Sequence, residues 1–559
     1  MEIENLVKRS LPVSELLSLL EASDFELAMR LKMDPRQDDV YGRTKEVAGK
    51  MVRRRAAHLL LRKLGPAQYL DSERILDAID RERMTYRIQY LSQQMKETGP
   101  IVNKGVDGFL KKAGDYRPER AIITGLGGSG IGALMAVELL NNMGYFIPVE
   151  IRRDYPGRHM QVGPSTLMIL CSFSGNTEET LFAYECAIKE SAQVICIATG
   201  GVLKEQATSR GHTFIEIPIK NGFKGAQVIQ TPRESVGFSL MIFLSIFSRL
   251  GLATRDGSGF NVDELDLNHV SGKIDRLDEM WGPGIPFDRN LAKQAALYFM
   301  YGSKDSEGFD PSSLRIPVII VDSSNASLGV RIENQFGESV EGFIKVLTFA
   351  EDIHNEIEAL ASLALEPKFL NERPPYAFIA LRSADEAGRA TQRLNKTLEE
   401  LFQKNGIDYL SLEAEGDTPF ERKLYLLKLL DYIRAYACLL RGSKPLPVPF
   451  MDRMKRIMWS CPTVEDEHLL DLLSDNDRIW TVEELERNED RGISAYPLLR
   501  ANLKRLKNAD LIRIDEVGRI TITKRGEMSR CPINRQQHQT VVKSDVKRRK
   551  RCNSPGFQG

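Results

Sequence analysis

Two groups of glycine and hydroxyl residues stand where an apolar run gives way to a helical pattern. They are GLGGSGIG (125–132) and CSFSGNTEET (171–180). Glycines let a backbone approach an anion closely, and the free N–H groups of a helix's first turn favour phosphate. Hydroxyl and amide donors at the end of a strand hold a phosphate without needing a cation. Together the two groups predict a phosphate cradle.

Each group also allows a second interpretation. GLGGSGIG satisfies the G-x-G-x-x-G pattern of a dinucleotide-binding turn, which is a weak signal by itself. The second group could be a helix cap alone, with Asn176 or Thr177 as the capping residue. One such residue would suffice for a cap, whereas this segment places the hydroxyls of Ser172, Ser174 and Thr177 around a glycine. The second group therefore favours a phosphate ligand over a dinucleotide.

The elements that must position these groups are short apolar strands alternating with helices. Continuous apolar strands separated by helices predict parallel sheets covered on both faces, hence an α/β fold. A linker rich in Gly, Ser and Asp at 253–261 divides two such units. Strands are predicted in the first unit at 121–125, 148–153, 166–172, 193–199 and 213–218, and in the second at 316–324, 342–349 and 376–382.

The sequence patterns at both ends of the chain differ from this alternation of strands and helices. Apolar residues at three- and four-residue spacing predict a helical N-terminal region, in which the basic run 50–55 is expected to be a solvated helix face, with a nucleic-acid face as the alternative. Near the C-terminus, three short helices and a hairpin predict a winged helix. The expected domains are 1–95 (helical), 96–260 (first α/β), 261–458 (second α/β), 459–530 (winged helix) and 531–559 (a basic disordered tail).

Residues 96 to 456 resemble the SIS (sugar isomerase) family, and in particular the bifunctional phosphoglucose/phosphomannose isomerases. The resemblance is carried by SFSGNTEE (172–179) with GLGGSGIG (125–132), by TPRESVG (231–237) and by IHNEI (353–357). It implies tandem SIS domains, a homodimer, and no metal or organic cofactor. It also implies interconversion of glucose 6-phosphate and fructose 6-phosphate through a cis-enediol, with mannose 6-phosphate left open as a further substrate.

The resemblance further implies roles for individual side chains. Proton transfer between C1 and C2 needs a carboxylate. That base falls on Glu338, with Glu333 and Glu341 close enough to stay alternatives. Arg233 matches the arginine that stabilises the enediolate, and His354 and Lys455 match the ring-opening groups. The sugar and phosphate contacts match Gly127, Gly128, Ser129, Ser172, Ser174 and Thr177.

Three departures from the family pattern bear on these roles. Glu234 adds a carboxylate beside Arg233, where the family usually has a small residue. The family's Asn-Glu-Asn around the base reads GES (337–339), and its Asp-Pro-Thr ahead of the last lysine reads KPL (444–446). If that threonine helps to admit mannose 6-phosphate, Leu446 would narrow the protein to glucose and fructose 6-phosphates.

The predicted winged helix offers a second hypothesis from another class. Helix 493–507 would be its recognition helix, with basic residues opposite an apolar stripe, as suits phosphate contacts in a DNA groove. DNA or RNA contact and protein contact both stay open. A phosphosugar-sensing transcription regulator is therefore the alternative to an isomerase, although a sensor would need no base or ring-opening group. The candidate nucleic-acid contacts are Arg500, Lys504, Arg505 and Lys507.

Length and composition set the outer limits. A chain of 559 residues is expected to form about two to four domains. Lys plus Arg and Asp plus Glu both number 77, so no overall charge attracts nucleic acid or membrane. The seven cysteines have no zinc-ligand spacing, and we expect reduced, buried thiols. No signal peptide or membrane span is recognised, which predicts a cytoplasmic protein without a membrane partner.

Overall fold

The computed structural model divides the chain into two compact units, residues 1–447 and 448–559. Lys455, Leu446 and the tail 531–559 lie outside the residues that it describes. Those described are 7–8, 10–31, 44–114, 116–155, 162–219, 221–223, 226–227, 231–306, 309–310, 312–349, 351–369, 375–383, 389–445, 469–470, 472–473, 479–486, 499–508 and 510–523.

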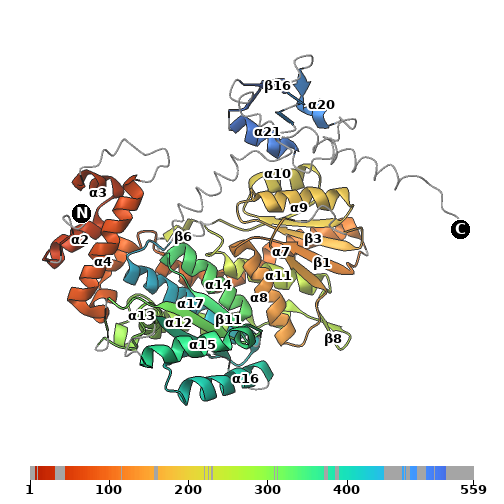
Figure 1. The fold of residues 1–559 in the computed structure, drawn as a ribbon. Coiled ribbons are helices and arrows are strands. Elements are labelled where there is room, and N and C mark those ends of the chain that lie inside the picture. The colour runs from red at the N-terminus through yellow and green to blue at the C-terminus, as the bar shows by residue number, and fades with distance from the viewer. Residues whose placement is uncertain are drawn as a thin grey trace. The chain divides into compact units, whose positions relative to one another are not determined.

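A five-stranded parallel sheet forms the centre of the first α/β region, with helices on both faces (Figure 1). Its strand order is β2-β1-β3-β4-β5, and β3 is buried along its whole length. All five predicted strands are confirmed; β1, β3 and β4 are largely buried apolar runs, whereas β2 and β5 each carry an exposed glutamate. The strands are β1 (Arg120–Thr124), β2 (Val149–Arg152), β3 (Thr166–Cys171), β4 (Gln193–Ala198) and β5 (Thr213–Glu216). Their helices are α7 (Leu91–Ala113), α8 (Gly128–Asn142), α9 (Glu178–Lys189), α10 (Gly201–Ser209) and α11 (Val236–Arg249).

A four-stranded parallel sheet in the order β11-β10-β12-β13 forms the second α/β region. The predicted linker before it contains a small hairpin, β8 (Thr254–Arg255) with β9 (Ser258–Gly259), flanked by the buried Ala253 and Phe260. The sheet strands are β10 (Ile316–Val321), β11 (Lys345–Thr348), β12 (Tyr376–Ser383) and β13 (Tyr409–Ala414). The helices are α12 (Leu267–Trp281), α13 (Leu291–Tyr301), α14 (Ala326–Gln335), α15 (Glu351–Phe369), α16 (Arg389–Thr397) and α17 (Pro419–Arg441), with π-helical turns η4 (Phe336–Val340) and η5 (Leu398–Gln403).

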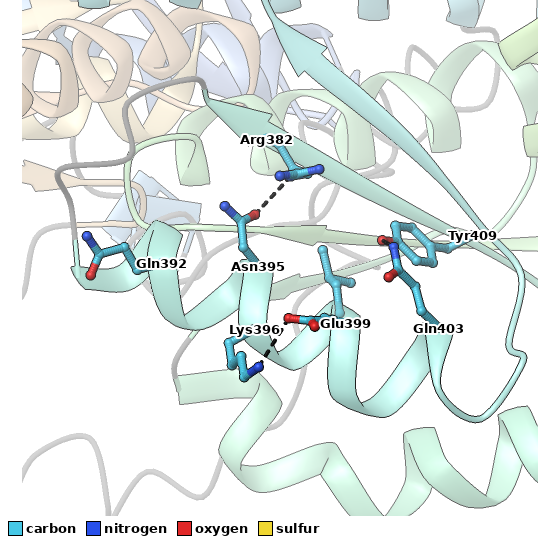
Figure 2. A pocket seen from close by; sticks show the side chains of 8 residues that line it. Arg382, Gln392, Asn395, Lys396, Glu399, Gln403 and Tyr409 are labelled. Carbon is cyan, nitrogen blue, oxygen red and sulfur yellow. Dashed lines mark hydrogen bonds and ion pairs between the residues drawn. The ribbon is translucent and has the colours of Figure 1, made fainter.

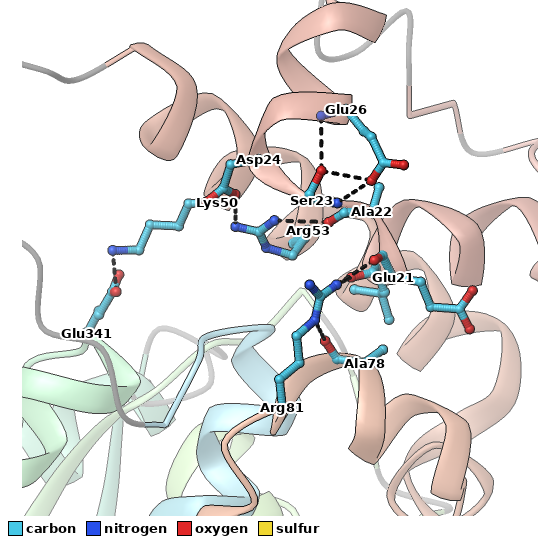
Figure 3. Close-up of polar contacts among 11 residues, drawn as sticks. Glu21, Ala22, Ser23, Asp24, Glu26, Lys50, Arg53, Ala78, Arg81 and Glu341 are labelled. Carbon is cyan, nitrogen blue, oxygen red and sulfur yellow. Dashed lines mark hydrogen bonds and ion pairs between the residues drawn. The ribbon is translucent and has the colours of Figure 1, made fainter. Parts of the chain in front are cut away.

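The N-terminal region is helical, as predicted, and packs onto the rest of its unit. The basic run 50–55 lies in α4, and neither of its two predicted roles holds for Arg53. Arg53 is only 6% exposed and pairs with Asp24 of α3, because a charge beneath packed helices requires a partner (Figure 3). The helices are α2 (Val13–Glu21), α3 (Asp24–Arg30), α4 (Thr44–Leu70), α5 (Glu73–Ile79) and α6 (Met84–Arg87).

Helix α17 is the core of the first unit, with almost every side chain buried. It packs against α4, α12 and α13, and thereby joins the N-terminal helices to the second sheet. Cys438 in this helix is buried, as are Cys171 and Cys196 of the first sheet, as expected, whereas Cys186 is only half-buried. Within the described residues, no helix is long and apolar enough to cross a membrane.

The C-terminal unit has a small apolar core beneath an antiparallel sheet in the order β14-β16-β15. Trp480 lies in a short strand that pairs with β16, and its indole is buried. The described elements are β14 (Trp480–Thr481), α20 (Val482–Glu486), α21 (Leu499–Asn508), β15 (Ile512–Ile514) and β16 (Arg519–Ile522).

Candidate active site

The two glycine and hydroxyl groups meet at one point of the first sheet. The loop 125–127 follows β1, and the loop 172–177 follows β3. Because β1 and β3 are neighbours, and the chain runs outward from them in opposite directions, this is the point where the strand order reverses. Crevices at the carboxyl ends of strands at such a reversal are where open α/β sheets bind ligands.

The hydroxyl groups of the predicted cradle are held in a local hydrogen-bond network. Ser172 Oγ lies 2.8 Å from Thr177 Oγ1 and accepts a hydrogen bond from the Gly175 N–H at 3.1 Å. Ser129 Oγ, from the first loop, accepts one from the Phe173 N–H at 3.0 Å, which ties the two loops together. Ser174 is exposed beside them. The structure therefore brings the predicted serines and the threonine into one cluster.

Two glycines are required by the shape of these loops. Gly127 has φ +52° and Gly175 φ +68°, in the left-handed region that other residues rarely adopt. A Cβ on Gly175 would lie 1.8 Å from the carbonyl oxygen of Gly200, so no side chain fits. A Cβ on Gly128 would lie 2.7 Å from Pro232, which places the start of α8 directly against the turn carrying Arg233.

Arg233 and Glu338, predicted as enediolate stabiliser and base, face each other across the two α/β regions. Arg233 Nε lies 3.7 Å from Glu338 Oε2, with the arginine side chain 5% exposed and the glutamate 25% exposed. Arg233 also donates to Ser339 Oγ and, at 3.2 Å, to the Pro445 carbonyl. Burial, followed by repulsion from Arg434, lowers the pKa of Arg233. A buried cation beside a partly exposed carboxylate is the arrangement that proton transfer at carbon needs.

The tertiary structure separates the three candidate carboxylates. Glu333 is exposed on α14, and Glu341 is paired with Lys50 and Arg54 of α4. Glu338, on the π-helical turn η4, is the one that lies beside Arg233. Glu338 is thus favoured as the base over the two alternatives.

Arg434 of α17 is a second guanidinium at this point, and sequence reasoning missed it. It is fully buried and donates to the same two acceptors as Arg233, Ser339 Oγ at 3.2 Å and the Pro445 carbonyl at 3.4 Å. Within the described part of the chain, its Nε and Nη2 atoms have no hydrogen-bond partner. The only signal for it was an arginine inside the otherwise apolar stretch IRAYACLL (433–440).

The unusual Glu234 beside Arg233 has a partner from the N-terminal helices. Arg87 Nη1 lies 2.5 Å from Glu234 Oε1, and both side chains are buried. Glu234 Oε2 accepts from the Thr231 N–H and hydroxyl, each at 2.9 Å. Gln94 of α7 donates to the Glu234 carbonyl at 2.7 Å. The departure from the family pattern is therefore an ion pair that fixes the turn bearing Arg233.

Of the two predicted ring-opening groups, His354 alone lies among the described residues. His354 is exposed on α15, and within the described residues it has no hydrogen bond or ion pair. Lys455 falls outside these residues.

The predicted nucleic-acid contacts lie in the C-terminal unit. Arg505 is buried and donates to Asn502 at 2.7 Å, so it cannot serve as the predicted phosphate contact, whereas Lys507 is exposed. Arg500 and Lys504 lie on α21, but their side chains are not among those described.

Two other features do not belong to this site. A hollow of about 480 Å³ lies over α16, η5 and the edge of the second sheet, where Arg382 bonds to Asn395 and Lys396 pairs with Glu399 (Figure 2). The cluster of His269, Asp417 and Glu421 has metal-ligand atom types, but Lys273 already pairs with both carboxylates. A cation of the chain itself thus occupies the centre of that cluster.

Sequence comparison with known proteins finds relatives over about two thirds of this chain. Residues 312–458 match the family model of the bacterial phospho-glucose isomerase C-terminal SIS domain. The bifunctional phosphoglucose/phosphomannose isomerase of Caldicellulosiruptor bescii is 30% identical over 372 residues, which cover 66% of this chain and 96% of that one. Its counterpart from Aquifex aeolicus is 27% identical over 361 residues, or 63% of this chain and 97% of that one. The tagatose-6-phosphate ketose/aldose isomerase of Escherichia coli superposes with a TM-score of 0.46 at 13% identity, over 65% of this chain and 95% of that one. This chain belongs to the bifunctional phosphoglucose/phosphomannose isomerase family.

Proposed function

We propose that the protein interconverts glucose 6-phosphate and fructose 6-phosphate through a cis-enediol intermediate. The observation that carries this proposal is the approach of Arg233 and Glu338 to 3.7 Å beside the glycine and serine cradle. A carboxylate, a buried cation and a phosphate site in one place match the three requirements of the reaction. A sensor would need the cradle alone, so this pairing favours the enzyme over the phosphosugar-sensing regulator.

In this proposal Glu338 moves the proton. Its carboxylate removes the C2 proton of the open-chain aldose and returns it to C1, and reverses these roles for the ketose. Negative charge develops on the oxygens of the enediolate in between. Arg233 stabilises that charge from its buried position, where a cation interacts more strongly than in water.

The phosphate is assigned to the cradle, where Ser129, Ser172, Ser174 and Thr177 offer hydroxyl groups and Gly127 and Gly128 leave room for the backbone to approach. The phosphate's negative charge is also favoured by the N-terminal ends of α8 and α9, neither of which has a side-chain cap. The sugar opens its ring before the proton moves. His354 and Lys455 are proposed for that step on the family resemblance alone.

The decisive experiment is a coupled assay of fructose 6-phosphate turnover on the full chain and on Glu338→Gln. The variant is expected to lose about 10³-fold in kcat, as removal of a general base does. Glu333→Gln is the matched control, because Glu333 is exposed on the neighbouring helix, and should retain activity within about twofold. An inactive wild type whose melting temperature is nevertheless raised by fructose 6-phosphate would establish the sensor instead.

Mannose 6-phosphate is proposed to be the poorer aldose, because Leu446 replaces the family's threonine ahead of the last lysine. The ratio of kcat/KM for the two aldoses, in the wild type and in Leu446→Thr, tests this. A rise in the relative mannose rate is expected in the variant. Equal rates for both sugars in the wild type would contradict the assignment.

We further infer that residues 459–530 form a winged helix. The supporting features are α21 followed by the hairpin of β15 and β16, and the pairing of β14 with β16. DNA contact would then rest on Lys507, Arg500 and Lys504. Anisotropy of a labelled mixed-sequence duplex should show binding at 50 mM salt that is lost at 200 mM. Absence of binding at low salt would favour protein contact.

A cytoplasmic homodimer completes the proposal. It rests on the family resemblance, and sedimentation of the purified chain at micromolar concentration tests the dimer. A monomer at all concentrations would contradict it.

A further inference from the structure

Two side chains of helix α4 pair with Glu341, the residue that follows the π-helical turn η4. Lys50 pairs with Glu341 Oε1, and Arg54 with Glu341 Oε2, so both oxygens of this glutamate are held by the N-terminal region (Figure 3 shows Lys50). These side chains are only partly exposed, which reduces screening of the pairs by solvent. Two residues of the basic run 50–55 thus engage a single carboxylate three positions beyond Glu338.

Glu341 has a backbone conformation that needs support. It lies in the left-handed region, with φ 56° and ψ 42°, which a residue with a Cβ adopts at a conformational cost. From this position its N–H donates to the Phe336 carbonyl at 3.0 Å and closes the π-helical turn η4. That turn carries Glu338, the proposed base, and Ser339, the acceptor of Arg233 and Arg434.

The same helix also holds the chain after α17. Arg54 donates to Ser443 Oγ at 3.4 Å, and Ser443 Oγ donates to the Val340 carbonyl at 3.4 Å, at the end of η4. A Cβ on Gly442 would lie 2.7 Å from the Cβ of Ala57, so the end of α17 rests directly on α4. Pro445, whose carbonyl accepts from Arg233, follows two residues after Ser443. Helix α4 therefore supports both segments that accept from Arg233, the turn η4 with Ser339 and the chain leading to Pro445.

We propose that Lys50 and Arg54 are positioning residues of the isomerase site. By holding Glu341 in its left-handed conformation they keep η4 closed, and so keep Glu338 turned toward Arg233. The proposal rests on the proposed function for the role of Glu338, and it assigns a purpose to the N-terminal helices. A displacement of about 1 Å in a catalytic group costs up to roughly 100-fold in rate, which sets the size of the effect.

Two substitutions at Glu341 separate the backbone conformation from the side chain. Glu341→Ala removes the ion pairs and keeps the conformational cost, and should lower kcat about 10- to 100-fold with KM within about threefold. Glu341→Gly also removes the ion pairs, but glycine adopts this conformation without cost. It should retain kcat within about fivefold. Where the wild type is active, equal activity of the two variants, whether high or low, would overturn the proposal.

The second measurement does not depend on activity. Hydrogen exchange of the peptide covering residues 336–341 should become faster in Lys50→Met/Arg54→Met, because the closed turn loses its support. Asp24→Asn is the matched control. It weakens the ion pair between Asp24 of α3 and Arg53 of α4, the helix that also carries Lys50 and Arg54, but it leaves the pairs with Glu341 intact. Unchanged exchange in the double variant would overturn the proposal. An inactive wild type with the expected exchange pattern would instead refute the proposed function and leave the positioning role standing.

Discussion

The two parallel-sheet regions differ in the residues that follow their first strands, β1 and β10. After β1, the first region has a glycine loop without charged side chains, next to the serine cradle. After β10, the second region has Asp322, fully buried. Asp322 Oδ1 accepts from the Ser324 hydroxyl at 2.6 Å and from Asn325 Nδ2 at 3.1 Å, and Oδ2 accepts from the Thr391 hydroxyl at 2.6 Å.

This difference shows that topology alone does not make an anion site. Both sheets present the carboxyl ends of parallel strands, where donors gather. In the second region a carboxylate of the chain itself satisfies those donors, whereas the loops 125–127 and 172–177 of the first region contain no carboxylate. Under the proposed function, the second region contributes the base on the η4 turn, and the duplicated architecture divides binding and proton transfer between its halves.

The largest expected effect tests how the first region depends on other helices. Arg87→Met leaves Glu234 buried without its cation and should lower the free energy of unfolding by about 3–5 kcal/mol. Arg87→Met/Glu234→Gln should recover part of that loss, because no buried charge is left unpaired. Urea unfolding of both variants measures the effect. A double variant less stable than the single one would show that Glu234 is held by its other contacts.

The second largest expected effect tests the hydrogen-bond cluster around Asp322 in the second region. Asp322→Ala leaves Ser324, Asn325 and Thr391 without their acceptor and should cost about 2–4 kcal/mol of unfolding free energy. Because no ligand is assigned there, KM for fructose 6-phosphate should stay within about twofold of the wild type. Thermal unfolding and steady-state kinetics on one preparation check both parts. A raised KM at unchanged stability would mean that both regions bind substrate.

Substitution of Ser172 should give the opposite result to that of Asp322, namely a changed KM with little change in stability. Ser172→Ala removes a hydroxyl of the cradle and should raise KM for fructose 6-phosphate about tenfold, the value of one hydrogen bond to a charged group. The unfolding free energy should fall by only about 1 kcal/mol, since the hydroxyl is also bonded within its loop. A large loss of stability at constant KM would reduce the cradle to a capping motif.

The smallest effect concerns pH and the edge of the first region. Burial, with Arg210 and Lys112 nearby, lowers the pKa of His212, whose Nδ1 lies 2.8 Å from the Tyr184 hydroxyl. The unfolded chain therefore binds more protons below about pH 6.5, so this contribution to stability is complete above that pH and is lost as pH falls. In His212→Gln, the drop in melting temperature between pH 7.5 and 5.5 should be smaller than in the wild type. An unchanged drop would assign the pH dependence to other groups.

The sequence by itself determined most strands of the two sheets and the tight loops after β1 and β3, because both depend on neighbours in the chain. A buried parallel strand must be apolar along its length, and a tight loop needs its own glycines, as at Gly175. Strand β13 was not predicted, although the alternation of apolar and polar residues over 410–413 is the pattern of a half-buried strand.

The resemblance placed the base on Glu338 and left Glu333 and Glu341 as alternatives. Only the tertiary structure separates the three by their surroundings, because their spacing along the chain is nearly equivalent and Arg233, which Glu338 approaches, lies about a hundred residues away. The pairing of Arg87 with Glu234 spans 147 residues, and that of Arg54 with Glu341 spans 287. A buried charge is satisfied by whichever partner the packed helices bring to it, and local sequence carries no record of that partner.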